Sequence, residues 1–215
     1  SENLAVYCDG NTQGSSIPGL HTGRVEFGMT FSSTPWKVQE QLLYSSTYVH
    51  SGAVKQWYCI PAYASSMFDS LMQQLYSDYM MSMEWEHPLG PNLMVSPETL
   101  IDRGVPVYGC TQEKGTLVIC YPNSYNCSVN LGLNMSESML MVLPDWLRIS
   151  SQATSLYRNH RVPSLFSVEK MILNAFDEID SLGCETKYWV SLEFSRIVQE
   201  ESMLRHKLWG EGLRK

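Results

Sequence analysis

The sequence predicts a mainly β protein, either a barrel or a two-sheet jelly roll, with one helical insert and a helical C-terminal part. Three observations predict this fold: many short β-type segments at irregular spacing, one segment of helical periodicity among them, and long helical patterns after residue 145. Short strands that do not alternate with helices are typical of barrels and jelly rolls. With 215 residues, 44% of them hydrophobic, the chain can bury a substantial core.

The chain begins with a segment that is rich in Gly, Ser and Asn, and residues 1–23 are expected to be a partly flexible lead-in. Strands are then expected where β-branched and aromatic residues lie between Gly, Pro, Ser and Asn. These strands are predicted at residues 25–31, 41–49, 55–61, 105–108, 116–121 and 139–143. Together they predict a jelly-roll domain over residues 1–150.

Helices are predicted in two places. One helix is expected to interrupt the strands at residues 64–81, because Phe68, Leu71 and Leu75 recur at a spacing of three to four residues. Three more helices are expected after the strands, at residues 146–157, 167–181 and 187–208. They predict a helical subdomain over residues 151–215.

Charge and cysteine content limit the functional classes. The chain has 15 Lys and Arg against 22 Asp and Glu, a net charge of −7, so direct nucleic-acid binding by this chain is not expected. Its six cysteines form no Cys-x-x-Cys pair, which favours free thiols in a reducing compartment over a zinc site. No run of eighteen or more apolar residues is present, so no membrane contact is expected.

A series of short motifs between residues 17 and 150 resembles one known family in both order and spacing. The motifs are Ile17-Pro18-Gly19-Leu20, Phe27-Gly28-Met29, Phe31-Ser32-Ser33, Tyr44-Ser45, Tyr48, His50, Gly52, Lys55, Trp57-Tyr58, Pro61, Val105-Pro106-Val107-Tyr108, Pro122, Tyr125, Asn130, Gly132, Asn134 and Asp145-Trp146-Leu147. They resemble the JmjC domain of the JARID-type histone lysine demethylases. The resemblance implies a cupin-like double-stranded β-helix, the JmjC jelly roll, whose mouth would hold Fe(II), 2-oxoglutarate and a methylated histone lysine.

The resemblance also identifies three positions at which the family holds its metal ion. The family's His-x-Glu…His ligands fall on Lys37, Gln39 and Asn126 of this chain. An ammonium has no lone pair to donate, and a carboxamide is a neutral, weak oxygen donor. Fe(II) sites of this type need two imidazoles and one carboxylate. The resemblance therefore implies that no Fe(II) binds, and two placements of Lys37 are open: its ammonium fills the metal position, or it extends to solvent.

The expected cosubstrate pocket is only partly preserved. The resemblance places Lys55 where the family's lysine pairs with the distal carboxylate of 2-oxoglutarate, and Ser45 and Asn130 match polar contacts. Thr34 and Thr47, in contrast, replace an aromatic residue and an asparagine. Because the metal normally anchors the oxoacid end, 2-oxoglutarate is expected to bind weakly or not at all.

Three functional hypotheses follow from the resemblance. The first is a nuclear, non-catalytic pseudo-demethylase module that acts as a scaffold. It is based on a likeness to a catalytically degenerate fungal family member found in a histone deacetylase complex, and it implies that subunits of such a complex are the partners. The second is an active or unusual demethylase that depends on Fe(II) and 2-oxoglutarate. The third is a reader that binds a histone tail or a small carboxylate without turnover.

Overall fold

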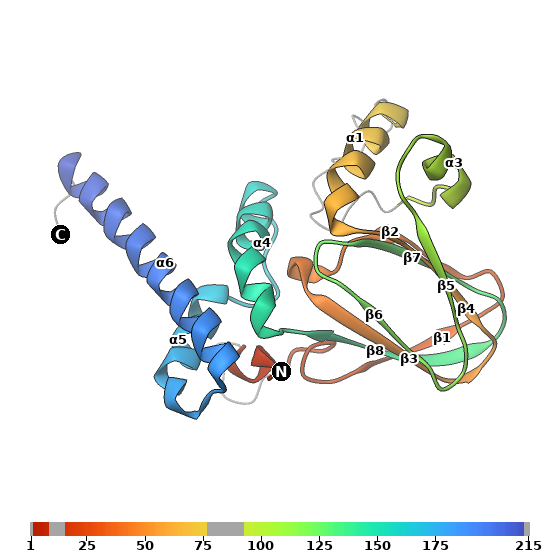
Figure 1. Cartoon of the computed structure of the whole chain (residues 1–215), viewed down its shortest axis with the longest axis horizontal. Helices are drawn as coiled ribbons and strands as arrows, with labels where there is room; N and C mark the ends of the chain where they lie inside the picture. The colour runs from red at the N-terminus through yellow and green to blue at the C-terminus, as the bar shows by residue number, and fades with distance from the viewer. Residues whose placement is uncertain (1, 9–15, 77–92, 213–215) are drawn as a thin grey trace.

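The computed structural model describes residues 2–8, 16–76 and 93–212. Two four-stranded antiparallel sheets face each other (Figure 1). The first sheet has the order β1 (Arg24–Gly28), β8 (Asn134–Met141), β3 (Tyr44–Gly52) and β6 (Leu117–Cys120). The second has the order β2 (Ser33–Lys37), β7 (Tyr125–Asn130), β4 (Lys55–Ile60) and β5 (Tyr108–Gln112). The expected jelly roll is thus confirmed.

The helical insert covers the outer face of the second sheet, where α1 (Ser65–Leu75) and α3 (Pro97–Asp102) lie in Figure 1. The Phe68 ring of α1 lies between two rings of the sheet, with centroid distances of 5.8 Å to Trp36 and 4.4 Å to Tyr125. The expected helix at 64–81 is confirmed for its first part. Residues 77–81 lie outside the described residues.

Asp69 on α1 connects the insert to the sheet, because the Tyr125 hydroxyl donates a hydrogen bond of 2.6 Å to its carboxylate. Burial raises the pKa of Asp69 above its ordinary 3.8, and the Tyr125 hydrogen bond opposes this shift only in part. The folded state therefore holds a proton at Asp69 more tightly than the unfolded state does. The charged carboxylate destabilises the fold at neutral pH, and this penalty disappears as the pH falls below the ordinary aspartate pKa.

We accordingly expect Asp69→Asn to raise the thermal unfolding midpoint at neutral pH, because the amide oxygen still accepts from Tyr125 without carrying a charge. The difference from the unsubstituted chain should shrink as the pH falls through the aspartate range. Thermal unfolding of both proteins over a pH series measures this effect, with the exposed Asp102→Asn as the control. A lower midpoint for Asp69→Asn at neutral pH would contradict the expectation.

Three helices follow the strands at one end of the jelly roll: α4 (Leu147–Asn159), α5 (Val168–Asp177) and α6 (Cys184–Gly210). The Ser167 side chain caps α5 by accepting from the Lys170 backbone N–H at 3.2 Å. Rings of α5 and α6 stack, since Phe176 and Phe194 have centroids 4.0 Å apart and nearly parallel planes. All three expected C-terminal helices are confirmed. No helix of the described residues is long and apolar enough to cross a membrane.

Short 3₁₀ turns join several of these elements, at Leu4–Tyr7, Glu40–Leu42, Ala62–Ala64, Pro144–Trp146 and Ile179–Ser181. The first of them corrects the expectation of a flexible lead-in for residues 4–8. Leu4, Ala5 and Cys8 are buried in the core, and the Leu4 N–H donates to the Val142 carbonyl at 2.7 Å. Apolar side chains fix this turn despite the Gly, Ser and Asn that follow it.

Further elements also differ from expectation. Strand β7 and helix α3 were not expected, and the strand expected at 105–108 begins only at Tyr108. β7 has the sequence Tyr-Asn-Cys-Ser-Val-Asn, and asparagine is depleted in strands generally. Pairing with β2 on one side and β4 on the other holds it in place. Tertiary pairing therefore overrides local propensity in this strand.

Gln41 joins the strands to the C-terminal helices. Its side chain is 1% exposed and makes two hydrogen bonds with the Phe166 backbone, donating to the carbonyl at 3.2 Å and accepting from the N–H at 3.1 Å. Its own backbone N–H donates to the Tyr157 hydroxyl, and its carbonyl accepts from the Trp146 indole. This buried network fixes the segment between β2 and β3 that also carries Gln39.

Gln41→Met is expected to lower the free energy of unfolding by about 2–3 kcal/mol, because it leaves two buried backbone groups of Phe166 without a partner. Urea unfolding measures the loss. Gln73 lies exposed on α1, so the same change there, Gln73→Met, should stay within about 0.5 kcal/mol. Equal losses in the two variants would contradict the role of Gln41.

Candidate functional site

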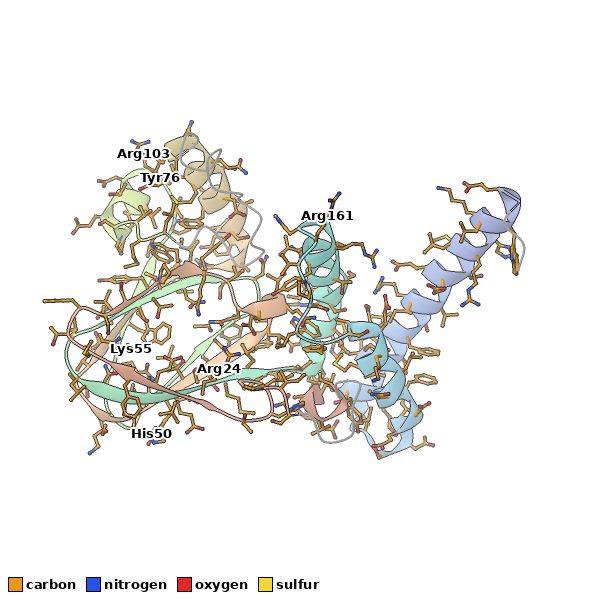
Figure 2. All side chains as sticks on the ribbon, turned by 180° about the vertical axis from the view of Figure 1, so that it is seen from behind. Arg24, His50, Lys55, Tyr76, Arg103 and Arg161 are labelled. Carbon is orange, nitrogen blue, oxygen red and sulfur yellow. The ribbon has the colours of Figure 1, made fainter. Side chains whose placement is uncertain are left out.

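A polar cavity of about 100 Å³ lies between the two sheets. Seven of the eight site positions expected from the sequence line it: Thr34, Lys37, Gln39, Ser45, Thr47, Lys55 and Asn126. In Figure 2, Lys55 and Arg24 mark this interior region, with Arg24 nearer to the C-terminal helices. Residues that are far apart in the sequence thus meet at one place.

Strand β2 supplies Thr34 and Lys37 through a local irregularity, and Gln39 lies just beyond its end. Thr34 and Lys37 are three positions apart, so a regular strand would place their side chains on opposite faces. The register between β2 and β7 shifts between these two residues, and a shift of this kind brings both side chains to the cavity face. Lys37 then pairs directly with Asn126 of β7, and Gln39 follows two residues later.

The three positions that the resemblance assigned to metal ligands line one cavity, and their side-chain groups do not suit Fe(II). The Gln39 amide donates to the Asn126 side-chain oxygen at 3.4 Å, and the Asn126 amide donates to the Ser124 carbonyl at 3.4 Å. The third position, Lys37, offers an ammonium. Among the described residues no group of three or more His, Cys, Asp or Glu side chains could hold a metal ion. A facial set of two imidazoles and a carboxylate cannot be assembled from these three side chains.

Lys55 is the most buried charge of the cavity, with 3% of its surface exposed. Its ammonium lies 3.4 Å from a Glu26 carboxylate oxygen and 5.1 Å from the centre of the Trp57 ring. Ser138 donates to the other oxygen of the same carboxylate at 2.8 Å. The lysine that the resemblance assigned to a cosubstrate carboxylate is therefore paired with a carboxylate of the protein.

Asn130 is the one expected position that does not line the cavity. It lies directly opposite Lys55 in the sheet, yet its amide donates to the Ser32 hydroxyl at 2.9 Å and its oxygen accepts from Asn134 at 2.9 Å. In this structure Asn130 links β7 to the β1–β2 connection through its hydrogen bond to Ser32.

The sequence did not single out three charged residues that also line the cavity: Arg24, Glu26 and Glu40. Arg24 and Glu40 approach to 4.0 Å. Charged residues in a strand normally indicate its solvent face, so no sequence signal distinguished Glu26 as the partner of a lysine twenty-nine positions away.

A second hollow of about 340 Å³ adjoins the cavity, and Trp57 and Asn126 line both. Its walls are largely apolar and include the thiols of Cys59, Cys110 and Cys120. Burial raises the pKa of all three thiols, that of Cys120 to about 11. These groups are therefore neutral thiols at physiological pH. They form no disulfide, so the free thiols expected from the sequence are confirmed for them.

His50, one of the family motif residues, lies at the surface away from the cavity (Figure 2). Its ring nitrogen is 3.0 Å from a Glu137 carboxylate oxygen, and its ring packs edge-on against Tyr48. A surface contact with Glu137 accounts for this histidine.

The chain thus has the architecture of a two-sheet jelly roll with a polar cavity between its sheets. Residues 24–140 match the family described as "JmjC domain, hydroxylase". The chain therefore belongs to the JmjC domain family, as its motifs indicated. The chain is also similar to several lysine-specific demethylases, which supports its likeness to the JARID type.

The chain is 32% identical over 209 residues to "Lysine-specific demethylase JMJ17" of Arabidopsis thaliana, with 94% of the chain and 16% of that protein covered. It is 31% identical over 213 residues to "Lysine-specific demethylase 5B" of Gallus gallus, with 99% of the chain and 14% of that protein covered. The Homo sapiens "Lysine-specific demethylase 5D" is 29% identical over 213 residues, with 99% of the chain and 13% of that protein covered. The chain thus spans only about one-sixth or less of the length of these relatives.

Proposed function

We propose that this chain is a non-catalytic JmjC module that acts as a protein-interaction scaffold in a nuclear, chromatin-regulating complex of the histone deacetylase type. The observation that carries this proposal is the donor set at Lys37, Gln39 and Asn126, which combines one ammonium with two amides. The jelly roll keeps its shape around that set. A retained fold without iron donors favours a structural role over a catalytic one.

The pairing of Lys55 with Glu26 supports the same proposal on the cosubstrate side. A dicarboxylate would have to displace the Glu26 carboxylate from Lys55, and it would find no metal to anchor its oxoacid end. We therefore propose that Fe(II) does not bind and that 2-oxoglutarate binds weakly or not at all. Calorimetric titration with 2-oxoglutarate tests this point, and saturation at micromolar concentrations would contradict it.

The C-terminal helix offers a surface suited to protein partners. Helix α6 extends away from the jelly roll in Figure 1, and its second half carries exposed Met203, Leu204, Leu208 and Trp209. Exposed apolar groups of this kind are commonly covered by other chains. They support the scaffold proposal without identifying the partner.

Affinity purification from nuclear extract tests the scaffold directly. We expect a deacetylase or an assembly factor of its complex to co-purify with the chain, and Leu204→Ser combined with Leu208→Ser to reduce that recovery. Val6 is an exposed apolar residue at the other end of the chain, and Val6→Ser is the control. Recovery of the chain alone from nuclear extract would count against a scaffold.

The second candidate is an active Fe(II)- and 2-oxoglutarate-dependent lysine demethylase, which the names of the relatives favour. It requires iron ligands other than those at positions 37, 39 and 126.

A third candidate is a reader of histone tails or small carboxylates. Peptide titration separates the reader from the scaffold, and formation of succinate separates the enzyme from both.

A further inference from the structure

The cavity lining does not balance its own charges. It contains three cations, Arg24, Lys37 and Lys55, and two carboxylates, Glu26 and Glu40. Lys55 pairs with Glu26 at 3.4 Å, and Arg24 approaches Glu40 at 4.0 Å. Within the described parts of the chain, the ammonium of Lys37 has neither an ion-pair partner nor a hydrogen bond. The lining therefore carries one uncompensated positive charge, at Lys37.

The amides beside Lys37 hydrogen-bond elsewhere and not to its ammonium. The side-chain oxygen of Asn126 accepts from Gln39, and its nitrogen donates to the Ser124 carbonyl. Lys37 itself is only half-buried and lies close enough to Cys120 to act on that thiol electrostatically. Its ammonium is thus an unpaired charge at the wall of a cavity, and such a charge attracts a counter-ion.

The rest of the lining indicates which counter-ion fits. Hydroxyl groups of Thr34, Ser45 and Thr47 line the same cavity, and hydroxyls can donate to an anion. The cavity, at about 100 Å³, exceeds the roughly 10–15 Å³ that a single water molecule needs, so it has room for a small ion. Carboxylates of Glu26 and Glu40 in the lining disfavour a second negative charge. A small monoanion meets all three conditions.

We propose that Lys37 makes this cavity a binding site for a small monoanion, either a halide or a short carboxylate such as formate. The inference rests on the proposed function in one respect, namely that no metal ion occupies the position of Lys37. It goes further in naming a ligand class for the converted site. A position that binds a divalent cation in the family would here bind an anion.

Chloride-35 NMR provides the test on the intact chain, because a bound chloride exchanging with the bulk broadens the bulk resonance. We expect excess broadening that formate displaces, and we expect Lys37→Met to reduce the formate-sensitive part about tenfold or more. Lys114 is an exposed lysine on the β5–β6 turn, so the matched Lys114→Met should retain the broadening. Thermal unfolding confirms that both variants are folded.

Equal formate-sensitive broadening in the unsubstituted chain and Lys37→Met would overturn the anion site, as would the absence of such broadening in both. Measuring the iron content of the same protein distinguishes failure of the anion site from failure of the proposed function. Absence of iron together with absence of Lys37-dependent anion binding overturns the anion site alone. Iron bound at positions 37, 39 and 126 overturns the proposed function.

Discussion

Lys37→His, Gln39→Glu and Asn126→His introduced together are expected to give the chain a metal site at these three positions. Lys37 and Asn126 are direct partners across β2 and β7, and the Gln39 and Asn126 amides are 3.4 Å apart, so the three side chains already converge. Two imidazoles and one carboxylate at these positions form the set that suits Fe(II) and Co(II). We expect Co(II) affinity to rise by more than about 100-fold, since even indirect contacts to ligands change metal affinity by about 10- to 100-fold.

The Co(II) absorption spectrum and calorimetric titration measure this gain without the oxidation that Fe(II) undergoes. The pair Lys37→His and Gln39→Glu without the change at Asn126 is the control, and it should bind more weakly because one ligand is missing. Circular dichroism confirms that both variants fold. A folded triple variant that binds Co(II) no better than the unsubstituted chain would show that the three positions do not converge as described.

Trp36→Ala is expected to cause the largest loss of stability, about 3–5 kcal/mol. Trp36 is completely buried, its indole N–H donates to the Val95 carbonyl at 2.9 Å, and its ring packs against Phe68. The substitution leaves a cavity between β2 and α1 and an unsatisfied buried carbonyl. Because Trp36 precedes Lys37 in β2, the same change should loosen the wall of the site.

Chemical denaturation measures the effect of Trp36→Ala, and the same change at an exposed tryptophan is the matched control. Trp209 on α6 is 62% exposed, so Trp209→Ala should stay within about 0.5 kcal/mol. A loss below about 1 kcal/mol for Trp36→Ala would contradict the described packing of α1 on the second sheet.

The sequence predicted most of the fold because its elements have clear local patterns. Helix α5 has both an apolar stripe and a serine cap, and β4 ends in a run of aromatic and apolar residues before Pro61, so both were placed within a few residues. Strand β7 lacks such a pattern because its buried positions include Asn126, Ser128 and Asn130. Its partners on both sides, which are distant in the sequence, determine its conformation.

The candidate site was predictable only in part, and for a similar reason. The family motifs placed Lys37, Gln39, Asn126 and Lys55 in one cavity, and the structure brings them together there. Motifs do not encode what each side chain contacts in this particular chain. The pairing of Lys55 with Glu26 depends on the packing of one sheet against the other. Local sequence patterns likewise do not show that the ammonium of Lys37 has no carboxylate partner among the described residues, because the nearby charges come from distant segments.

Iron content after anaerobic incubation with Fe(II), measured together with succinate formation from 2-oxoglutarate on methylated histone peptides, tests the central claim most directly. We predict that the desalted chain retains no stoichiometric iron and forms no succinate above the level without protein. One iron ion per chain accompanied by succinate would contradict the claim that Lys37, Gln39 and Asn126 leave the metal position without donors.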